Sequence, residues 1–114
     1  MSLIRFYANG RLATATLMQL RSATGRSAAE LANAEIGGGP IAEFVLFKKD
    51  HDQIAEKIKS LLANIAESEL SVVECVIDLK TGMERCHQTS FDIIKNILDE
   101  AEQISRDLDG RSED

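Results

Sequence analysis

The sequence predicts an α/β fold, a two-layer sandwich with a β-α-α-β-α-β core, a small sheet and an added C-terminal helix. Apolar residues switch between strand-like runs and helical spacing along the 114 residues. The composition, 44% apolar and 28% charged, is that of an ordinary globular domain. We therefore expect one α/β domain over residues 1–108, followed by a frayed charged tail over residues 109–114.

The first third of the chain predicts a strand and two helices. Residues 3–7 favour a strand that ends at the turn signal Asn9-Gly10. Helical spacing begins at Leu12, and Gly25 stands where a glycine commonly ends a helix. Ser27 and Glu30 form a Ser-x-x-Glu capping box, which predicts a second helix that stops at the three glycines before Pro40.

The middle of the chain predicts a strand and an amphipathic helix. Residues 41–47 are nearly all apolar, which predicts a central strand covered on both faces. Asp50 with Gln53 is expected to cap the helix that follows. The apolar positions of this helix fit one face, and we expect them to pack on the preceding strand: Ile54, Ile58, Leu61, Leu62 and Ile65.

The last third predicts a strand, a hairpin and a long helix. Residues 70–78 favour a strand, and Lys80-Thr81-Gly82 predicts a turn into a hairpin with residues 83–87. A helix over residues 91–108 would open at Thr89 or Ser90 and end at Gly110. The strands on either side of the middle helix should be parallel and joined by a right-handed crossover.

Charge and composition exclude several classes of function. Thirteen basic residues against nineteen acidic ones give a net charge of −6, which argues against a nucleic-acid partner. No apolar run approaches the roughly 20 residues that span a bilayer, so we expect no membrane partner. Two cysteines in a chain without a leader predict a cytoplasmic protein without a disulfide framework.

The residues that could bind a metal ion do not show the spacing of a metal site. His51, Cys75, Cys86 and His87 lack the paired spacing of a structural zinc site, so we expect thiols and imidazoles that pack within the fold. On a strand, Cys86 and His87 would point to opposite faces. Asp52 and its acidic neighbours begin a helix, where acidic residues are favourable. We expect no metal.

No catalytic motif is present either. The three glycines at 37–39 lead into a strand, whereas a phosphate-binding loop leads into a helix and carries Gly-Lys-Ser/Thr. Ser71, Ser90 and Cys75 lack the glycine elbow and neighbouring base of an activated nucleophile. We therefore expect no catalytic residue and no cofactor.

The segment LRSATG at 20–25, followed by SAAE at 27–30, resembles the helix–Thr-Gly–helix signature of the C-terminal domain of the bacterial ribosomal stalk protein. The strand ending at Gly10, Pro40 and the helix–strand unit at 49–73 stand at matching places. The resemblance covers residues 3–76, with insertions around residues 36–48, and the same fold serves the adaptor of the Clp protease. The resemblance implies a binding-type fold.

The departures from that family concern its binding face. The stalk domain holds translational GTPases through a basic helical face, and Arg21 stands at the position of its arginine, which makes it a candidate partner contact. Ala13 and Ala32 stand where the family carries lysines, so most of the electrostatic steering would be lost. About thirty-five residues are added after the shared part, and the resemblance therefore implies no ribosomal role.

These observations favour a small acidic, adaptor-like protein-interaction domain that is non-catalytic and binds an unknown protein partner. One alternative is a small-molecule-binding protein or minor enzyme with a cleft near the triple-glycine loop; another is a dimer like a secretion chaperone. A cavity lined by Cys75, His87 or His51 would favour the small-molecule function. A contiguous exposed apolar stripe would favour protein interaction.

The last helix is the candidate dimer interface. Six positions follow the 3-4-3-4-3 spacing of a coiled-coil seam, and a second stripe of three isoleucines lies beside them: Phe91, Ile94, Leu98, Ala101, Ser105 and Leu108, then Ile93, Ile97 and Ile104. If one face docks on the sheet, a second copy would cover the other and form a two-fold homodimer. The candidate interface residues are Phe91, Ile94, Ile97, Leu98, Ala101 and Ile104. Alternatively, one wide face packs within the monomer.

Overall fold

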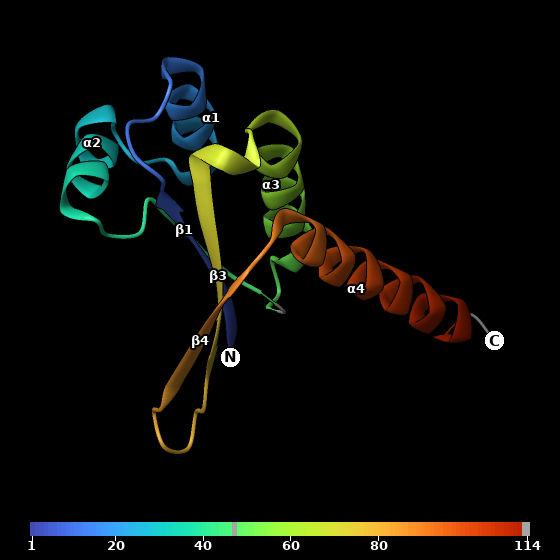
Figure 1. Cartoon of the computed structure of the whole chain (residues 1–114). Helices are drawn as coiled ribbons and strands as arrows, with labels where there is room; N and C mark the ends of the chain where they lie inside the picture. The colour runs from blue at the N-terminus through green and yellow to red at the C-terminus, as the bar shows by residue number, and fades with distance from the viewer. Residues whose placement is uncertain (47, 113–114) are drawn as a thin grey trace.

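The chain folds into a four-stranded sheet with helices on one side (Figure 1). The computed structural model describes residues 1–46 and 48–112, with the side chains of the last helix described as far as residue 103. The elements follow in the order β1 (Ser2–Ala8), α1 (Thr14–Thr24), α2 (Ala28–Gly37), β2 (Ala42–Val45), α3 (His51–Asn64), a short 3-10 turn (Glu67–Glu69), β3 (Leu70–Ile77), β4 (Glu84–Thr89) and α4 (Phe91–Ser112).

The sheet has the spatial order β2-β1-β3-β4, and every neighbouring pair is antiparallel. On β1, Ile4 is opposite Phe44 of β2, and Phe6 is opposite Val72 of β3. Because side chains alternate along a strand, these residues share one face, and Arg5 belongs to the other.

All four helices bury side chains against the face that carries Ile4 and Phe6. Phe6 contacts Phe44 and Phe91 edge to face, with ring centroids 6.1 and 6.4 Å apart. The helices add buried residues to this core, among them Leu20, Leu31, Ile58, Leu61, Phe91, Ile94 and Leu98. We call the opposite side of the sheet, which carries Arg5, the open face. The predicted α/β fold is confirmed.

The predicted ends of α1 and α2 are confirmed. Gly25 has φ +73°, and its N–H donates to the carbonyl of Arg21 at 2.9 Å, closing α1. The capping box between Ser27 and Glu30 is formed at the start of α2. Gly38, also at φ +73°, ends α2 before the chain turns into β2.

Helix α3 packs through the face that its spacing predicts. Ile58, Leu61, Leu62 and Ile65 are buried in the same core as residues of β2, and Ile54 is half-buried against it. The predicted cap is wrong in detail. Asp50 takes the position before the helix, but its side chain makes no capping hydrogen bond.

Strand β2 corrects the prediction of a central strand covered on both faces. It is the edge of the sheet next to β1, and it contains only residues 42–45 of the predicted 41–47. Ala42 and Phe44 are buried, whereas Glu43 between them is exposed on the open face. The apolar run reflects burial of Ile41 and Leu46 just beyond the strand ends, rather than cover on both faces of the strand.

Strands β3 and β4 form the predicted hairpin, with Gly82 at φ +73° in its turn. Strands β2 and β3 are both antiparallel to β1, so they run parallel to each other, as predicted for the strands flanking α3. They are not neighbours, because β1 lies between them.

Helix α4 begins as predicted but is longer. The N–H of Ile93 donates to Ser90 Oγ at 3.3 Å, and the N–H of Phe91 donates to Glu67 Oε2 at 2.8 Å. The helix continues through Gly110, which was predicted to end it, as far as Ser112. Residues 113–114 of the predicted tail lie outside the described residues. In Figure 1 the C-terminal half of α4 runs away from the sheet and the other helices.

Among the described residues, no helix is long and apolar enough to cross a membrane.

We expect Ile58→Ala to lower the free energy of unfolding by about 2–5 kcal/mol, because the removed atoms leave a cavity in a fully buried site. Urea denaturation followed by circular dichroism measures the change. Ile36→Ala is the matched control, since Ile36 is 86% exposed on α2, and it should shift stability by less than about 0.5 kcal/mol. A loss below about 1 kcal/mol for Ile58→Ala would contradict the packing of α3.

We expect Gly25→Ala to destabilise the protein by about 1 kcal/mol, since an L side chain is strained at φ +73°. A Cβ at this position meets no atom within 4 Å, so the cost comes from the backbone conformation alone. Gly37→Ala is the control, because Gly37 also has open space and its φ is not positive. Thermal unfolding of both variants tests this, and equal melting temperatures would contradict it.

Candidate functional site

A disulfide crosses the hairpin, contrary to the expectation from the sequence. Cys75 of β3 and Cys86 of β4 are direct partners in the sheet, with their Cα atoms 4.1 Å apart, and their sulfur atoms are bonded. The expectation of two unpaired thiols is therefore wrong. Because the two cysteines are bonded to each other, they no longer indicate a reducing compartment. A cytoplasmic location stays a prediction.

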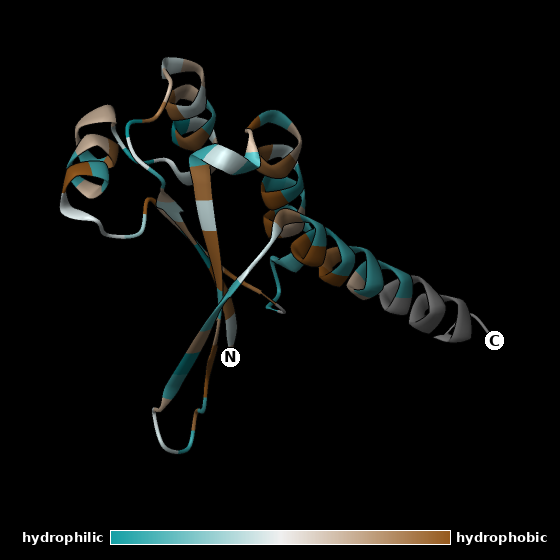
Figure 2. Ribbon diagram, viewed as in Figure 1, coloured by the Kyte–Doolittle hydropathy of each residue, from teal (hydrophilic) through white to brown (hydrophobic). Residues whose placement is uncertain are grey.

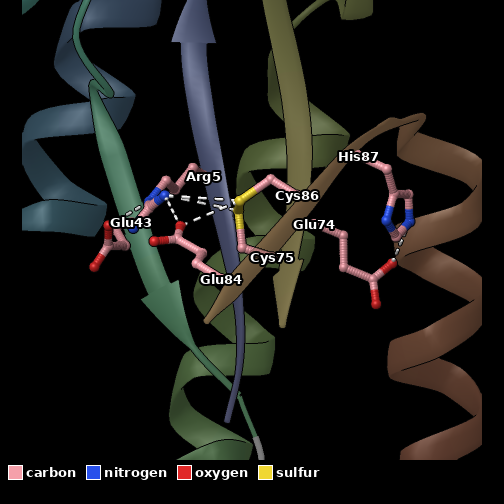
Figure 3. Close-up of a disulfide and its surroundings, with 7 residues drawn as sticks. All are labelled: Arg5, Glu43, Glu74, Cys75, Glu84, Cys86 and His87. Carbon is pink, nitrogen blue, oxygen red and sulfur yellow. Dashed lines mark hydrogen bonds and ion pairs between the residues drawn. A yellow bond between two sulfur atoms is a disulfide. The ribbon is translucent and has the colours of Figure 1, made fainter. Parts of the chain in front are cut away.

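The disulfide lies on the open face, beside the guanidinium of Arg5 (Figure 3). In the sheet, Leu3 is the partner of Cys75, and both are buried although they point away from the main core. Cys86, on the edge strand β4, is exposed. We call the group formed by the disulfide and its charged neighbours the Arg5 cluster; it consists of Arg5, Glu43, Cys75, Glu84 and Cys86.

All four strands of the sheet contribute to this cluster. The Arg5 side chain rises from β1; its Nε donates to Glu43 Oε2 of β2 at 2.7 Å, and its Nη1 donates to the carboxylate of Glu84 on β4. The same Nη1 lies 3.7 Å from Cys75 Sγ and 3.9 Å from Cys86 Sγ. One guanidinium group thus contacts two carboxylates and both sulfur atoms.

The positive charge of the Arg5 guanidinium lies next to the two sulfur atoms. The hydrogen bond to Glu43 raises the pKa of Arg5, and the hydrogen bond to Glu84 and the two carboxylate charges act in the same direction. Partial burial opposes them, and the net shift is upward. The carboxylates therefore favour the cationic form of Arg5.

A metal ion does not fit this cluster as it stands. The ligand atoms of Cys75, Glu84 and Cys86 lie within 4.8 Å of one another, which is close enough for a shared ion. Both sulfur atoms are consumed by the disulfide, however, and metal ions bind the thiolate. The guanidinium of Arg5 also places a positive charge where a cation would have to sit.

The histidines lie apart from the Arg5 cluster. His87 Nε2 lies 3.4 Å from Glu74 Oε2, on the face of the sheet opposite the disulfide (Figure 3). The expectation that Cys86 and His87 point to opposite faces is confirmed by the strand register. His51 is the first residue of α3.

Two basic residues, Arg21 and Lys59, have different surroundings. Arg21 is exposed in the last turn of α1, where a partner could reach it. Lys59 on α3 instead pairs with Asp99 at 3.2 Å and Glu102 at 3.0 Å on α4. The hydrogen bond to Glu102, and then that to Asp99, raises the pKa of Lys59. Lys59 therefore ties α4 to the body.

The predicted coiled-coil seam of α4 is corrected in part. Phe91, Ile94 and Leu98 are buried in the core of the same chain and face the sheet and α3, so they are not available to a second copy. Ala101 is half-buried. Of the seam, the side chains of Ser105 and Leu108 lie outside the described residues.

The second stripe of α4 is less covered. Ile93 is 49% exposed, and Ile97 is half-buried against the edge of the core. The side chain of Ile104 lies outside the described residues.

Two surface hollows do not have the lining expected for a small-molecule site. One lies between α1 and α2 and includes Leu12, Leu17 and Glu35; the other lies beside the N-terminus and includes Met1 and Leu79. Neither of these two is lined by the triple glycine, Cys75, His51 or His87. The first hollow does reach Ile36, the residue before the triple glycine, so it lies near that loop but lacks the cysteine or histidine lining that would favour a small-molecule function.

Comparison of the chain with protein-family models, curated proteins and solved structures found no significant match. The resemblance to the ribosomal stalk domain therefore stays a prediction.

The charged members of the Arg5 cluster were not predicted from the sequence. Arg5, Glu43 and Glu84 come from three strands whose pairing order no local pattern specifies. The disulfide did leave a signal. Cys75 and Cys86 stand nearly symmetrically about the predicted turn at residues 80–82, which makes them candidate partners across a hairpin.

We expect Glu43→Gln to lower the free energy of unfolding by only about 0.2–1 kcal/mol, because the Arg5–Glu43 pair is partly exposed. High salt should shrink the difference, since salt screens exposed charges. Urea denaturation at low and high salt measures both effects. Glu56→Gln on the exposed side of α3 is the control. A large effect that is independent of salt would contradict this account.

Proposed function

We propose that this chain is a small adaptor-like protein-interaction domain, which forms a homodimer through α4. The observation that carries the proposal is the second stripe of α4, where Ile93 is 49% exposed and Ile97 is only half-buried. Large apolar side chains that stay exposed next to each other on a regular element are typical of protein interfaces. The hydropathy colouring in Figure 2 shows apolar residues along the body side of α4 and polar residues around them.

The shape of α4 supports the same proposal. The helix has 22 residues, and its C-terminal half leaves the body of the domain. A helical segment of this size has little stability in water without tertiary contacts, because propensity alone barely offsets the cost of nucleation. A projecting helix with an apolar stripe therefore favours a partner that covers it.

A second copy of this chain is the occupant that we propose. The stripe of Ile93, Ile97 and Ile104 follows helical spacing over 12 residues, so two copies can pair antiparallel with the same residues on both sides. Such a two-fold contact closes on itself and exposes no further copy of the interface. It also extends the core that Leu98 and Ile94 already form within each chain.

The remaining surface would then bind the protein partner. Arg21 on α1 is the candidate contact, because it is exposed and stands at the arginine position of the stalk-like motif. The binding-type fold that the resemblance implies supports this role, and the loss of lysines at Ala13 and Ala32 favours a different partner from the translational GTPases.

We expect light scattering at micromolar concentration to give a mass of twice the 12.5 kDa of one chain. Ile93→Glu should convert the dimer to a monomer, since each interface would bury two added charges without partners. Its circular dichroism should remain helical, because Ile93 is not part of the core. The matched control is Ile36→Glu, an equally drastic change at an 86% exposed residue of α2, which should stay dimeric.

A wild-type mass of one chain that persists as the concentration rises would overturn the dimer. A dimer that survives both Ile93→Glu and Ile97→Glu would instead place the interface elsewhere, with the exposed edge strand β4 as the next surface to test.

A further inference from the structure

The two sulfur atoms of the disulfide differ in access. Cys75 is fully buried on β3, whereas Cys86 is exposed on β4, which is the edge of the sheet. No residue of β4 is buried in the described structure. A dissolved thiol that approaches the open face therefore reaches Cys86 first.

The two sulfur atoms share their charged neighbours at different distances: Arg5 Nη1 lies 3.7 Å from Cys75 Sγ and 3.9 Å from Cys86 Sγ, and the Glu84 carboxylate, near both, is in contact with Cys86. The Arg5 Nη1 that lies 3.7 Å from Cys75 Sγ would stabilise a thiolate there, as nearby cations do for reactive cysteines. Glu84 Oε1 lies 3.1 Å from Cys86 Sγ, which disfavours a thiolate on Cys86 and could accept the proton of a Cys86 thiol. Arg5 can thus support a thiolate on either sulfur, and the contact with Glu84 makes Cys75 the more favourable leaving group of the two.

The pairing of the hairpin does not rest on the disulfide alone. It joins two residues that the backbone already pairs, and the ladder continues on both sides, from Val72 opposite Thr89 to Ile77 opposite Glu84. Because the backbone pairing of the hairpin does not involve the sulfur atoms, we expect β3 and β4 to stay in register after cleavage.

We propose that Cys75–Cys86 is a thiol–disulfide exchange site, in which an incoming thiol attacks Cys86 and Arg5 holds the departing Cys75 thiolate. This site is separate from α4, so it neither requires nor excludes the proposed dimer.

The exchange balances with two thiols as the reductant. A thiolate RS⁻ attacks Cys86 Sγ; the new bond joins R–S to Cys86, the Cys75–Cys86 bond breaks, and its electron pair leaves on Cys75. A second thiolate then attacks the R sulfur of the mixed disulfide and releases Cys86, which takes a proton from solvent. The sum is protein disulfide plus 2 RSH giving protein dithiol plus RSSR, and the reverse reaction oxidises the protein.

The test uses the full oxidised chain with reduced glutathione as the probe. Acid-quenched samples analysed by mass give the rate of reduction, and peptide mapping locates the mixed disulfide, which we expect on Cys86. Arg5→Gln should slow the reaction about fivefold, because the leaving thiolate loses its cation. Glu84→Gln should speed it up, because a repelling charge is lost. The control Arg11→Gln removes an arginine that lies elsewhere, beside the hollow between α1 and α2, and should leave the rate unchanged.

The opposite signs separate the proposal from a merely structural effect. Arg5→Gln and Glu84→Gln both break the same ion pair, so a simple loosening of the strands would move both rates in the same direction. The proposal would be overturned if both rates shifted in the same direction, or if Arg5→Gln reacted at the rate of the control. It would also be overturned if glutathione were found on Cys75, or if the air-oxidised protein contained two free thiols.

Discussion

Side-chain alternation along β1 is the constraint on which the two sides of this molecule depend. The strand lies between β2 and β3, so its residues 3–6 have partners on both sides. Ile4 and Phe6 enter the helical core, and the intervening Arg5 must then face the other way. The same alternation on the other strands brings Cys75 and Glu84 to the side of Arg5. A shift of one residue in the register would bury the guanidinium in the core and abolish both arrangements.

Features that depend on neighbours in sequence were predictable. The left-handed glycine after α1, the capping box of α2 and the apolar face of α3 each follow from residues within a few positions of one another. Helical spacing on α4 identified two apolar stripes in the same way. It could not say which stripe the domain itself covers, because that depends on the sheet and α3 packing against Phe91, Ile94 and Leu98.

Features that depend on strand order were not predictable. The apolar run at residues 41–47 resembles a central strand, yet β1 takes the central place and leaves β2 at the edge. Arg5, Glu43 and Glu84 are far apart in sequence, and only the β2-β1-β3-β4 order makes them neighbours. The site proposed for exchange chemistry is therefore a product of topology, with only its two cysteines visible as a near-symmetrical pair about a turn.

The bridged hairpin also limits how far the chain can be stretched. The disulfide closes a loop between residues separated by 11 positions. A mechanical pull on the two ends would pass from β3 to β4 through the sulfur atoms, and the turn between them would carry no load. At roughly 3.5 Å per extended residue, the oxidised chain would be shorter than the reduced one by roughly 35 Å when fully drawn out. Reduction of the bond would therefore lengthen the fully extended chain by that amount, in the segment before α4.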